Sequence, residues 1–335
     1  MDSTHHTNRL QIMLLLALAL VLPLIVPTYY TQFASKAMLI SILALSLNLV
    51  VGHGGLVSLC HGAFFGLGGY MLGFMSPDDS GASLLVSVPV TLIAVGAVAA
   101  VIGYFSLRTR GIYFIMVTLA FGEMLFYLFH DTKMAGGSDG LYIYIKPELF
   151  IGNISLLDLE NVSTFYYVIL GCLTASIGLV SMITSSPFGH ALIAAKENEQ
   201  RALSLGYPVF WIRLTAFVIS GMMAALAGYF SAAQFGFVAP QMLGWHLSAT
   251  ILVMVVLGGM GSVLGPILGA FALLGLEEVL KSSFEHWKLL KGIVIIIVVF
   301  ALPGGLQHLL KMIRPTKPAD PNGSAPSYIR EKADV

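Results

Sequence analysis

The chain has 335 residues, of which 57% are hydrophobic and only 10% are charged, and its 17 basic and 17 acidic side chains balance. Soluble domains carry about 25% charged residues, so this composition indicates a membrane protein, and the balanced charge gives no indication of a nucleic-acid partner. The two cysteines, Cys60 and Cys172, both lie in apolar stretches, so no disulfide is implied.

Long apolar stretches predict an all-α polytopic membrane protein, because about 20 apolar residues cross the hydrocarbon core as a helix. We expect about ten transmembrane helices, some of them short or broken, with approximate ranges 11–29, 34–51, 55–75, 83–105, 111–130, 164–184, 211–233, 247–259, 262–280 and 289–305. The apolar run 246–280 would form a helix about 52 Å long against a core of about 30 Å, so it is divided in two.

The distribution of Lys and Arg predicts the orientation, since these residues favour the cytoplasmic side. With ten spans, three basic stretches fall on one side: Arg108 and Arg110; Lys196, Arg201 and Arg213; and Lys311, Arg314, Lys317, Arg330 and Lys332. We therefore expect both termini in the cytoplasm, although Lys281, Lys288 and Lys291 would then lie outside. The transmembrane domain is predicted at 1–310 and a disordered cytoplasmic tail at 311–335.

Two glycine-rich breaks, at Gly52–Gly55 and Gly258–Ser262, are followed by similar residues. Matching interruptions in the two halves of a transporter point to the translocation path. If the breaks instead lie at the membrane surface, they are only tight turns. The candidate path residues in and near the breaks are Gly52, Gly54, Gly55, Ser58, His61, Gly258, Gly259, Gly261 and Ser262.

Glu123 is the one acid well inside a predicted span, and it is the remaining candidate for the path. An intramembrane carboxylate is by default a functional candidate. The alternative is a structural role, in which it accepts a hydrogen bond from a neighbouring helix. The chain has no cluster of metal-ligand type and no GxxxxGK[ST] phosphate loop. We therefore predict no metal, no cofactor, no catalytic residue and no ATPase site of its own.

The segment 186–210 is the only long, polar-marked stretch between two apolar blocks. Ala191–Leu205 lacks Gly and Pro and is rich in helix-forming residues, so it predicts one helix of about four turns between two spans. Such a helix is either an ordinary solvated loop or a docking element for a soluble partner.

Several motifs together resemble the branched-chain amino-acid permease family of ABC importers, over about Ala34 to Leu302. They are KENEQRALSLG in the polar segment, LSLNLVVGHGGLVSLCHGAFFGLGGY, GIYFIMVTLAFGEM, GGSDGL and VLGGMGSVLGP. The first is similar to the coupling loop of that family, which usually reads ExAA or close to it; here Gln200 and Arg201 stand where small residues are common.

The resemblance implies the ABC importer permease fold and transport of leucine, isoleucine and valine across the bacterial inner membrane, driven by ATP hydrolysis on separate subunits. The implied partners are two ABC ATPase subunits, a second homologous permease subunit and a periplasmic solute-binding protein. The residues implied to couple to the ATPases are Ala195, Lys196, Glu197, Asn198, Glu199, Arg201, Ala202 and Gly206.

Other functions stay open beside this one. Relatives of the family carry urea, short amides or aromatic compounds. A transporter driven by an ion gradient would need intramembrane acids as ion sites, and only Glu123 is well placed. A membrane enzyme would need a convergent nucleophile, base or metal set, which the sequence lacks.

Overall fold

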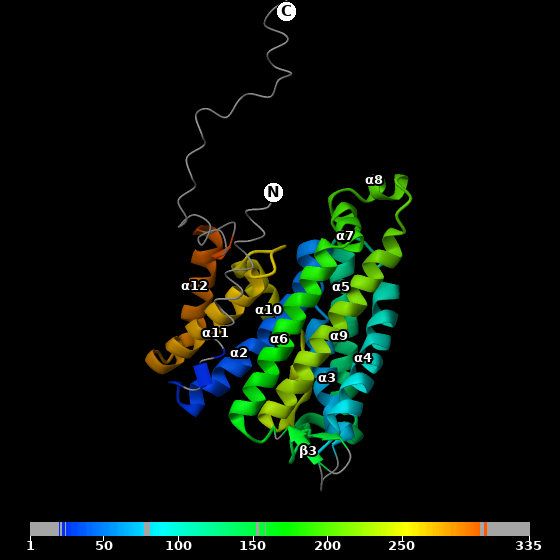
Figure 1. Ribbon diagram of the computed structural model, residues 1–335. Coiled ribbons are helices and arrows are strands. Elements are labelled where there is room, and N and C mark those ends of the chain that lie inside the picture. The colour runs from blue at the N-terminus through cyan, green and yellow to red at the C-terminus, as the bar shows by residue number, and fades with distance from the viewer. Residues whose placement is uncertain are drawn as a thin grey trace, which may run out of the picture.

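The computed structural model describes residues 20, 22–23, 25–76, 81–151, 154–157, 159–301 and 305–306. In this part the chain is a bundle of long helices packed side by side, with α7 and α8 at one end and strand β3 at the other (Figure 1). Most of the predicted first span, 11–29, and the whole predicted tail, 311–335, lie outside the described residues.

The described helices match the other predicted spans. They are α2 (Thr28–Asn48) with its π-helical continuation η1 (Leu49–His53), α3 (His61–Met75), α4 (Leu84–Ser106), α5 (Ile112–Asp131), α6 (Val162–Ser185), α9 (Val209–Phe235), α10 (Trp245–Gly258), α11 (Gly265–Ser283) and α12 (Trp287–Ala301). Five described segments are long and apolar enough to cross a membrane: Thr28–His53, α4, α5, α6 and α9. The prediction of an all-α membrane protein with some short helices is confirmed.

Glycines bring α3 and α9 into direct backbone contact. A Cβ atom added to Gly68 would lie 2.0 Å from the carbonyl oxygen of Ala225, and one added to Gly228 would lie 1.7 Å from that of Phe65. No side chain fits at either position, because real Cβ atoms do not approach an oxygen so closely. Small residues of this kind let membrane helices pack tightly.

The end of the bundle that carries the strands is tied together by two short antiparallel sheets. Strand β1 (Leu141–Tyr142) pairs with β4 (Phe237–Val238), and β2 (Leu149–Ile151) pairs with β3 (Ile154–Leu157). The motif GGSDGL, 136–141, follows the 3-10 turn η2 (Lys133–Ala135), contains the 3-10 turn η3 (Gly137–Asp139) and ends at the first residue of β1. Gly140 has a φ of +76° and packs on the backbone of Val238, so a turn role accounts for this motif.

Candidate translocation path and coupling surface

Two helices begin inside the bundle rather than at its ends. Helix α3 begins at His61, whose ring lies 2.6 Å from the hydroxyl of Ser220 near the middle of α9. Helix α10 begins at Trp245, and the N–H of Gly62 donates to the hydroxyl of Ser248 one turn later, at 2.8 Å. The first turns of α3 and α10 therefore meet in the middle of the bundle.

The segment that leads into α3, residues 54–60, is not helical, although the span 55–75 was predicted to be helical throughout. Its backbone finds partners within the protein: the N–H of Leu56 donates to the carbonyl of Val50 at 3.0 Å, and the N–H of Leu59 donates to the Thr118 hydroxyl of α5 at 3.2 Å. Non-helical backbone at membrane depth is tolerated only where it is buried in protein or lines a cavity. These contacts meet that requirement.

A corresponding segment leads into α10 from the opposite end of the bundle. It runs from Gly236 through β4 and the 3-10 turn η4 (Pro240–Leu243) to Gly244. The segment before α10 therefore corresponds to the one before α3, whereas Gly258–Ser262 lies where α10 ends and the chain turns into α11. This second segment contains Pro240 and no cluster of glycines. A pattern of glycine-rich stretches therefore does not identify it.

His61 is fully buried and sits in a continuous chain of hydrogen bonds. The Ser220 hydroxyl donates to the carbonyl of Ser46 at 2.5 Å, so its oxygen accepts the His61 Nε2–H at 2.6 Å. The other ring nitrogen, Nδ1, accepts from the Ser58 hydroxyl at 3.1 Å. An uncharged imidazole satisfies both ends of this chain, which ties the segment before α3 to α9 and α2.

Glu123 lies half-buried on α5 beside the start of α10. Its Oε1 accepts a hydrogen bond from the N–H of Trp245 at 3.4 Å, and the rings of Trp245 and His246 stack at 4.0 Å between centroids. A carboxylate near the first N–H groups of a helix is stabilising, because those groups carry partial positive charge. The contact matches the structural role considered for Glu123, a hydrogen bond from a neighbouring helix.

The two glycine-rich breaks predicted from the sequence meet each other near the end of α2. A Cβ atom added to Gly52 would lie 2.5 Å from the backbone nitrogen of Gly261. The Asn48 side chain, one turn before Gly52, donates to the carbonyl of Ser262 at 2.8 Å and accepts from the N–H of Gly261 at 3.0 Å. Gly258–Ser262 forms the turn between α10 and α11, and Gly259 and Gly261 have φ values of 112° and 78°. The structure brings these candidates together beneath α7, while it places Ser58, His61 and Glu123 around the starts of α3 and α10.

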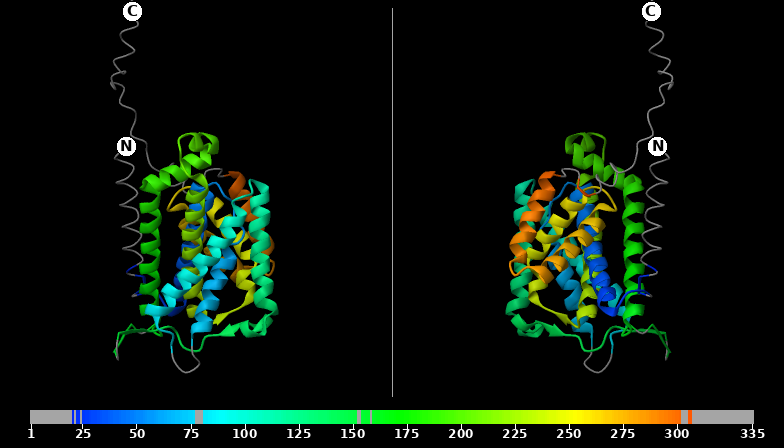
Figure 2. Two further views of the ribbon diagram at one scale, coloured as in Figure 1. Left: turned by 90° about the vertical axis from the view of Figure 1, so that its right-hand side faces the viewer. Right: turned by 90° about the vertical axis from the view of Figure 1, so that its left-hand side faces the viewer.

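The segment predicted as one helix, Ala191–Leu205, is two helices, α7 (Pro187–Glu197) and α8 (Glu199–Ser204). The break is at Asn198, whose side-chain oxygen accepts from the N–H of Arg201 at 2.9 Å. Asn is among the preferred N-cap residues, because its side chain replaces a missing helical partner. Figure 2 shows α7 and α8, in green, projecting beyond the ends of the membrane helices.

Four of the eight predicted coupling residues contact the rest of the protein, although one of them, Lys196, is exposed. Ala195 and Ala202 are buried against Val209. The Lys196 ammonium donates to the carbonyl of Gly52 at 2.7 Å, at the end of α2. The Glu199 carboxylate forms ion pairs with Arg110 and Arg213, each at 2.9 Å. These four residues hold α7 and α8 on the bundle. The other predicted coupling residues, Glu197, Asn198, Arg201 and Gly206, are all exposed.

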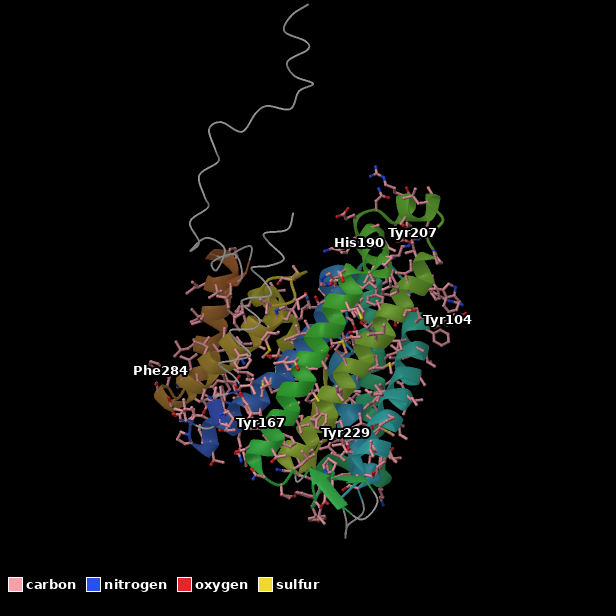
Figure 3. All side chains as sticks on the ribbon, in the orientation of Figure 1. Tyr104, Tyr167, His190, Tyr207, Tyr229 and Phe284 are labelled. Carbon is pink, nitrogen blue, oxygen red and sulfur yellow. The ribbon has the colours of Figure 1, made fainter. Side chains whose placement is uncertain are left out.

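Apolar side chains on the same tip were missed from the sequence. Leu203, Leu205 and Tyr207 are 50%, 69% and 42% exposed, and Figure 3 shows Tyr207 close to α8, at the tip of the molecule that α7 and α8 form. The sequence does indicate them, because three large apolar residues lie within five positions of a polar segment. A helix of about two turns is too short to bury all three. Exposed apolar groups of this kind, rimmed by polar residues, are typical of a contact with another protein.

Most of the chain is similar to proteins of one transport family. The family model described as branched-chain amino acid transport system / permease component matches residues 29–299. The high-affinity branched-chain amino acid transport system permease protein LivM of Escherichia coli K12 is 32% identical, over 94% of this chain and 77% of its own length. The LivM of Salmonella typhimurium LT2 gives the same values.

More distant relatives carry another name. The autoinducer 2 import system permease protein LsrC of Photorhabdus laumondii is 29% identical over 72% of this chain and 71% of its own length. No solved structure matches the chain. The family model covers most of the chain, and the motifs quoted above lie within it. The chain is therefore a member of the branched-chain amino acid transport system permease family, a family of membrane-spanning ABC transporter permeases.

Proposed function

We propose that this chain is the permease subunit of an ABC importer that carries leucine, isoleucine and valine across the bacterial inner membrane. One observation carries the proposal: the polar tip is bonded directly to the segment that enters the middle of the bundle. The Lys196 ammonium of α7 holds the carbonyl of Gly52, and the residues after Gly52 lead into α3.

Motion of the tip would reach the path through several contacts. A Cβ atom on Gly54 would lie 3.5 Å from the Leu192 side chain, and one on Gly55 would lie 2.8 Å from the Lys196 side chain, so α7 rests on this segment. The ion pairs of Glu199 link α8 to Arg110, before α5, and to Arg213 on α9. A push on α7 and α8 would therefore act on α2, α5 and α9, which surround the first turn of α3.

The family implies the partners of this chain. One of two ATPase subunits would bind the exposed tip, at Leu203, Leu205 and Tyr207, the other would bind the second permease, and both would hydrolyse ATP. A second, homologous permease subunit would complete the path, and a periplasmic solute-binding protein would deliver the substrate at the end that carries the sheets. Both termini would then lie in the cytoplasm, on the side of α7 and α8.

The branched-chain substrate is supported by the extent of the similarity to the two LivM proteins, which covers 94% of this chain, against 72% for the LsrC protein of Photorhabdus laumondii. Urea, short amides and aromatic compounds are the alternative substrates of the same type of importer. A carrier driven by an ion gradient is less well supported, because the Glu123 carboxylate already accepts a hydrogen bond from the backbone of α10.

Two experiments test this proposal. Purification of the tagged chain from its native membrane should recover an ABC ATPase, a second permease and a solute-binding protein that binds leucine. Single cysteines at the exposed positions Ser204, on α8, and Ser138, beside the sheets, should react with an impermeant maleimide only from the cytoplasm and only from outside, respectively. Reaction of both from the same side, or recovery without an ATPase, would contradict the proposal.

A further inference from the structure

A pocket of about 220 Å³ opens at the end of the bundle opposite α7 and α8. It is lined by one face of α2, by the last residues of α9 and by α11: Tyr29, Gln32, Phe33, Lys36, Gln234, Phe235 and Glu278. This volume is smaller than the about 300–1,000 Å³ of pockets that bind drug-sized molecules, so it suits a small ligand. The lining combines one cation, one anion, two amides and aromatic rings.

Lys36 is the only Lys, Arg, Asp or Glu in the apolar segment Thr28–His53. It is half-buried, and among the described residues its ammonium group forms no ion pair and no hydrogen bond. A charged side chain inside a membrane helix is costly and normally faces a cavity or a partner. Lys36 was not selected from the sequence, although its isolation within a span is the same signal that selected Glu123.

Two acceptors face the same pocket. The Tyr29 hydroxyl donates a hydrogen bond to Glu278, which holds that carboxylate at the pocket wall. The Gln234 side chain donates from Nε2 to the carbonyl of Gln32 at 2.8 Å, and its Oε1 is buried without a hydrogen-bond partner within the described part of the chain. A buried acceptor left unpaired is destabilising, so this oxygen calls for a donor from outside the described residues.

We propose that this pocket binds the zwitterionic head group of an amino acid. Lys36 and Glu278 line one pocket without forming an ion pair with each other, which suits a ligand that carries both charges. The Lys36 ammonium would bind the α-carboxylate, while the Glu278 carboxylate and Gln234 Oε1 would accept from the α-ammonium. Phe33 and Phe235 supply apolar surface for the side chain. The inference rests on the proposed function, since the ligand would be the transported amino acid.

The test uses the assembled importer in vesicles of phosphatidylglycerol, with leucine as the probe. Lys36→Cys removes the charge, and reaction with 2-aminoethyl methanethiosulfonate restores it after assembly, whereas methyl methanethiosulfonate adds a neutral group. Lys288→Cys is the matched control, because Lys288 is an exposed lysine on α12 that does not line the pocket. The wild-type importer supplies the background, since Cys60 is buried and Cys172 half-buried.

We expect Lys36→Cys to lower leucine uptake by about tenfold or more, because a hydrogen bond between charged groups is lost. The charged reagent should restore uptake and the neutral one should not, a difference that a purely structural role of Lys36 does not produce. Saturating leucine should also slow the reaction of the cysteine at position 36 with the reagent. It should not change the rate at which the control cysteine at position 288 reacts.

Three other outcomes would contradict the proposal, and each identifies a different cause. Uptake of leucine by Lys36→Cys at the wild-type rate, or modification that leucine does not slow, would overturn the pocket while leaving the proposed function intact. Wild-type importer that carries no leucine would instead refute the proposed function on which the pocket rests. Phosphatidylethanolamine carries the same two charges. Protection that appears only when this lipid is added would assign the pocket to lipid and overturn the proposal.

Discussion

Lys196→Met should uncouple ATP hydrolysis from transport. The substitution keeps the aliphatic stem beside Gly55 and removes the ammonium that donates to the buried carbonyl of Gly52 at 2.7 Å. A hydrogen bond to a charged group contributes roughly 1.5–3 kcal/mol, and the lower value applies because the Lys196 side chain is largely exposed. About 1.5 kcal/mol corresponds to a roughly tenfold change in an equilibrium constant. The equilibrium here is between α7 attached to the carbonyl of Gly52 and α7 detached from it.

The assay measures leucine uptake and ATP hydrolysis side by side in proteoliposomes that contain the purified complex. Uptake by Lys196→Met should fall about tenfold while ATP hydrolysis stays within about twofold of the wild-type rate. The control is Glu197→Gln, which changes the charge of the exposed neighbouring residue and should leave both rates unchanged. Equal numbers of molecules transported per ATP for Lys196→Met and wild type would refute the idea that this contact transmits motion.

Substitutions at three further positions, with Gly178→Ala as a control, test separate features of the structure. Gly206 has a φ of +84° and open space around it, so Gly206→Ala and Gly206→Trp should destabilise the protein equally, by roughly 1–2 kcal/mol, while only the Trp variant abolishes uptake and ATPase stimulation. Glu123→Gln should keep uptake near normal, because the amide oxygen still accepts from the N–H of Trp245, whereas Glu123→Leu should lower the yield of assembled complex. Gly228→Ala should destabilise the bundle by roughly 1–3 kcal/mol or more, because α3 and α9 touch there, whereas Gly178→Ala, in open space on α6, should not alter the melting temperature of the detergent-solubilised complex.

The sequence predicts the membrane helices well, because apolar length is what a span requires. It fails at residues 54–60, since a buried extended segment is as apolar as a buried helix. The apolar residues Leu56, Val57 and Leu59 fit the pattern of a span. The N–H of Leu59, which has no helical partner, instead donates to the hydroxyl of Thr118 on α5, a helix far away in the sequence. Such a partner is visible only in three dimensions.

The coupling segment shows a different kind of failure. Asn198 stands where a helix cap is favoured, yet the good helix formers around it predict one continuous helix. The residues Ala195, Ala202 and Glu199 were selected for docking by resemblance, but their side chains are used to hold α7 and α8 on the bundle. The face of a short amphipathic helix that becomes buried depends on the helices it packs against. The sequence of the short helix alone therefore does not predict which of its residues are buried.

The most direct test of the account is transport by the reconstituted complex. Purified permease chains with their ATPases are placed in proteoliposomes that contain ATP inside, with the solute-binding protein and labelled leucine outside. We predict leucine uptake that needs both ATP and the binding protein and that is unaffected when proton and sodium gradients are collapsed. Uptake by the permease alone, driven by an ion gradient without ATP, would contradict the account.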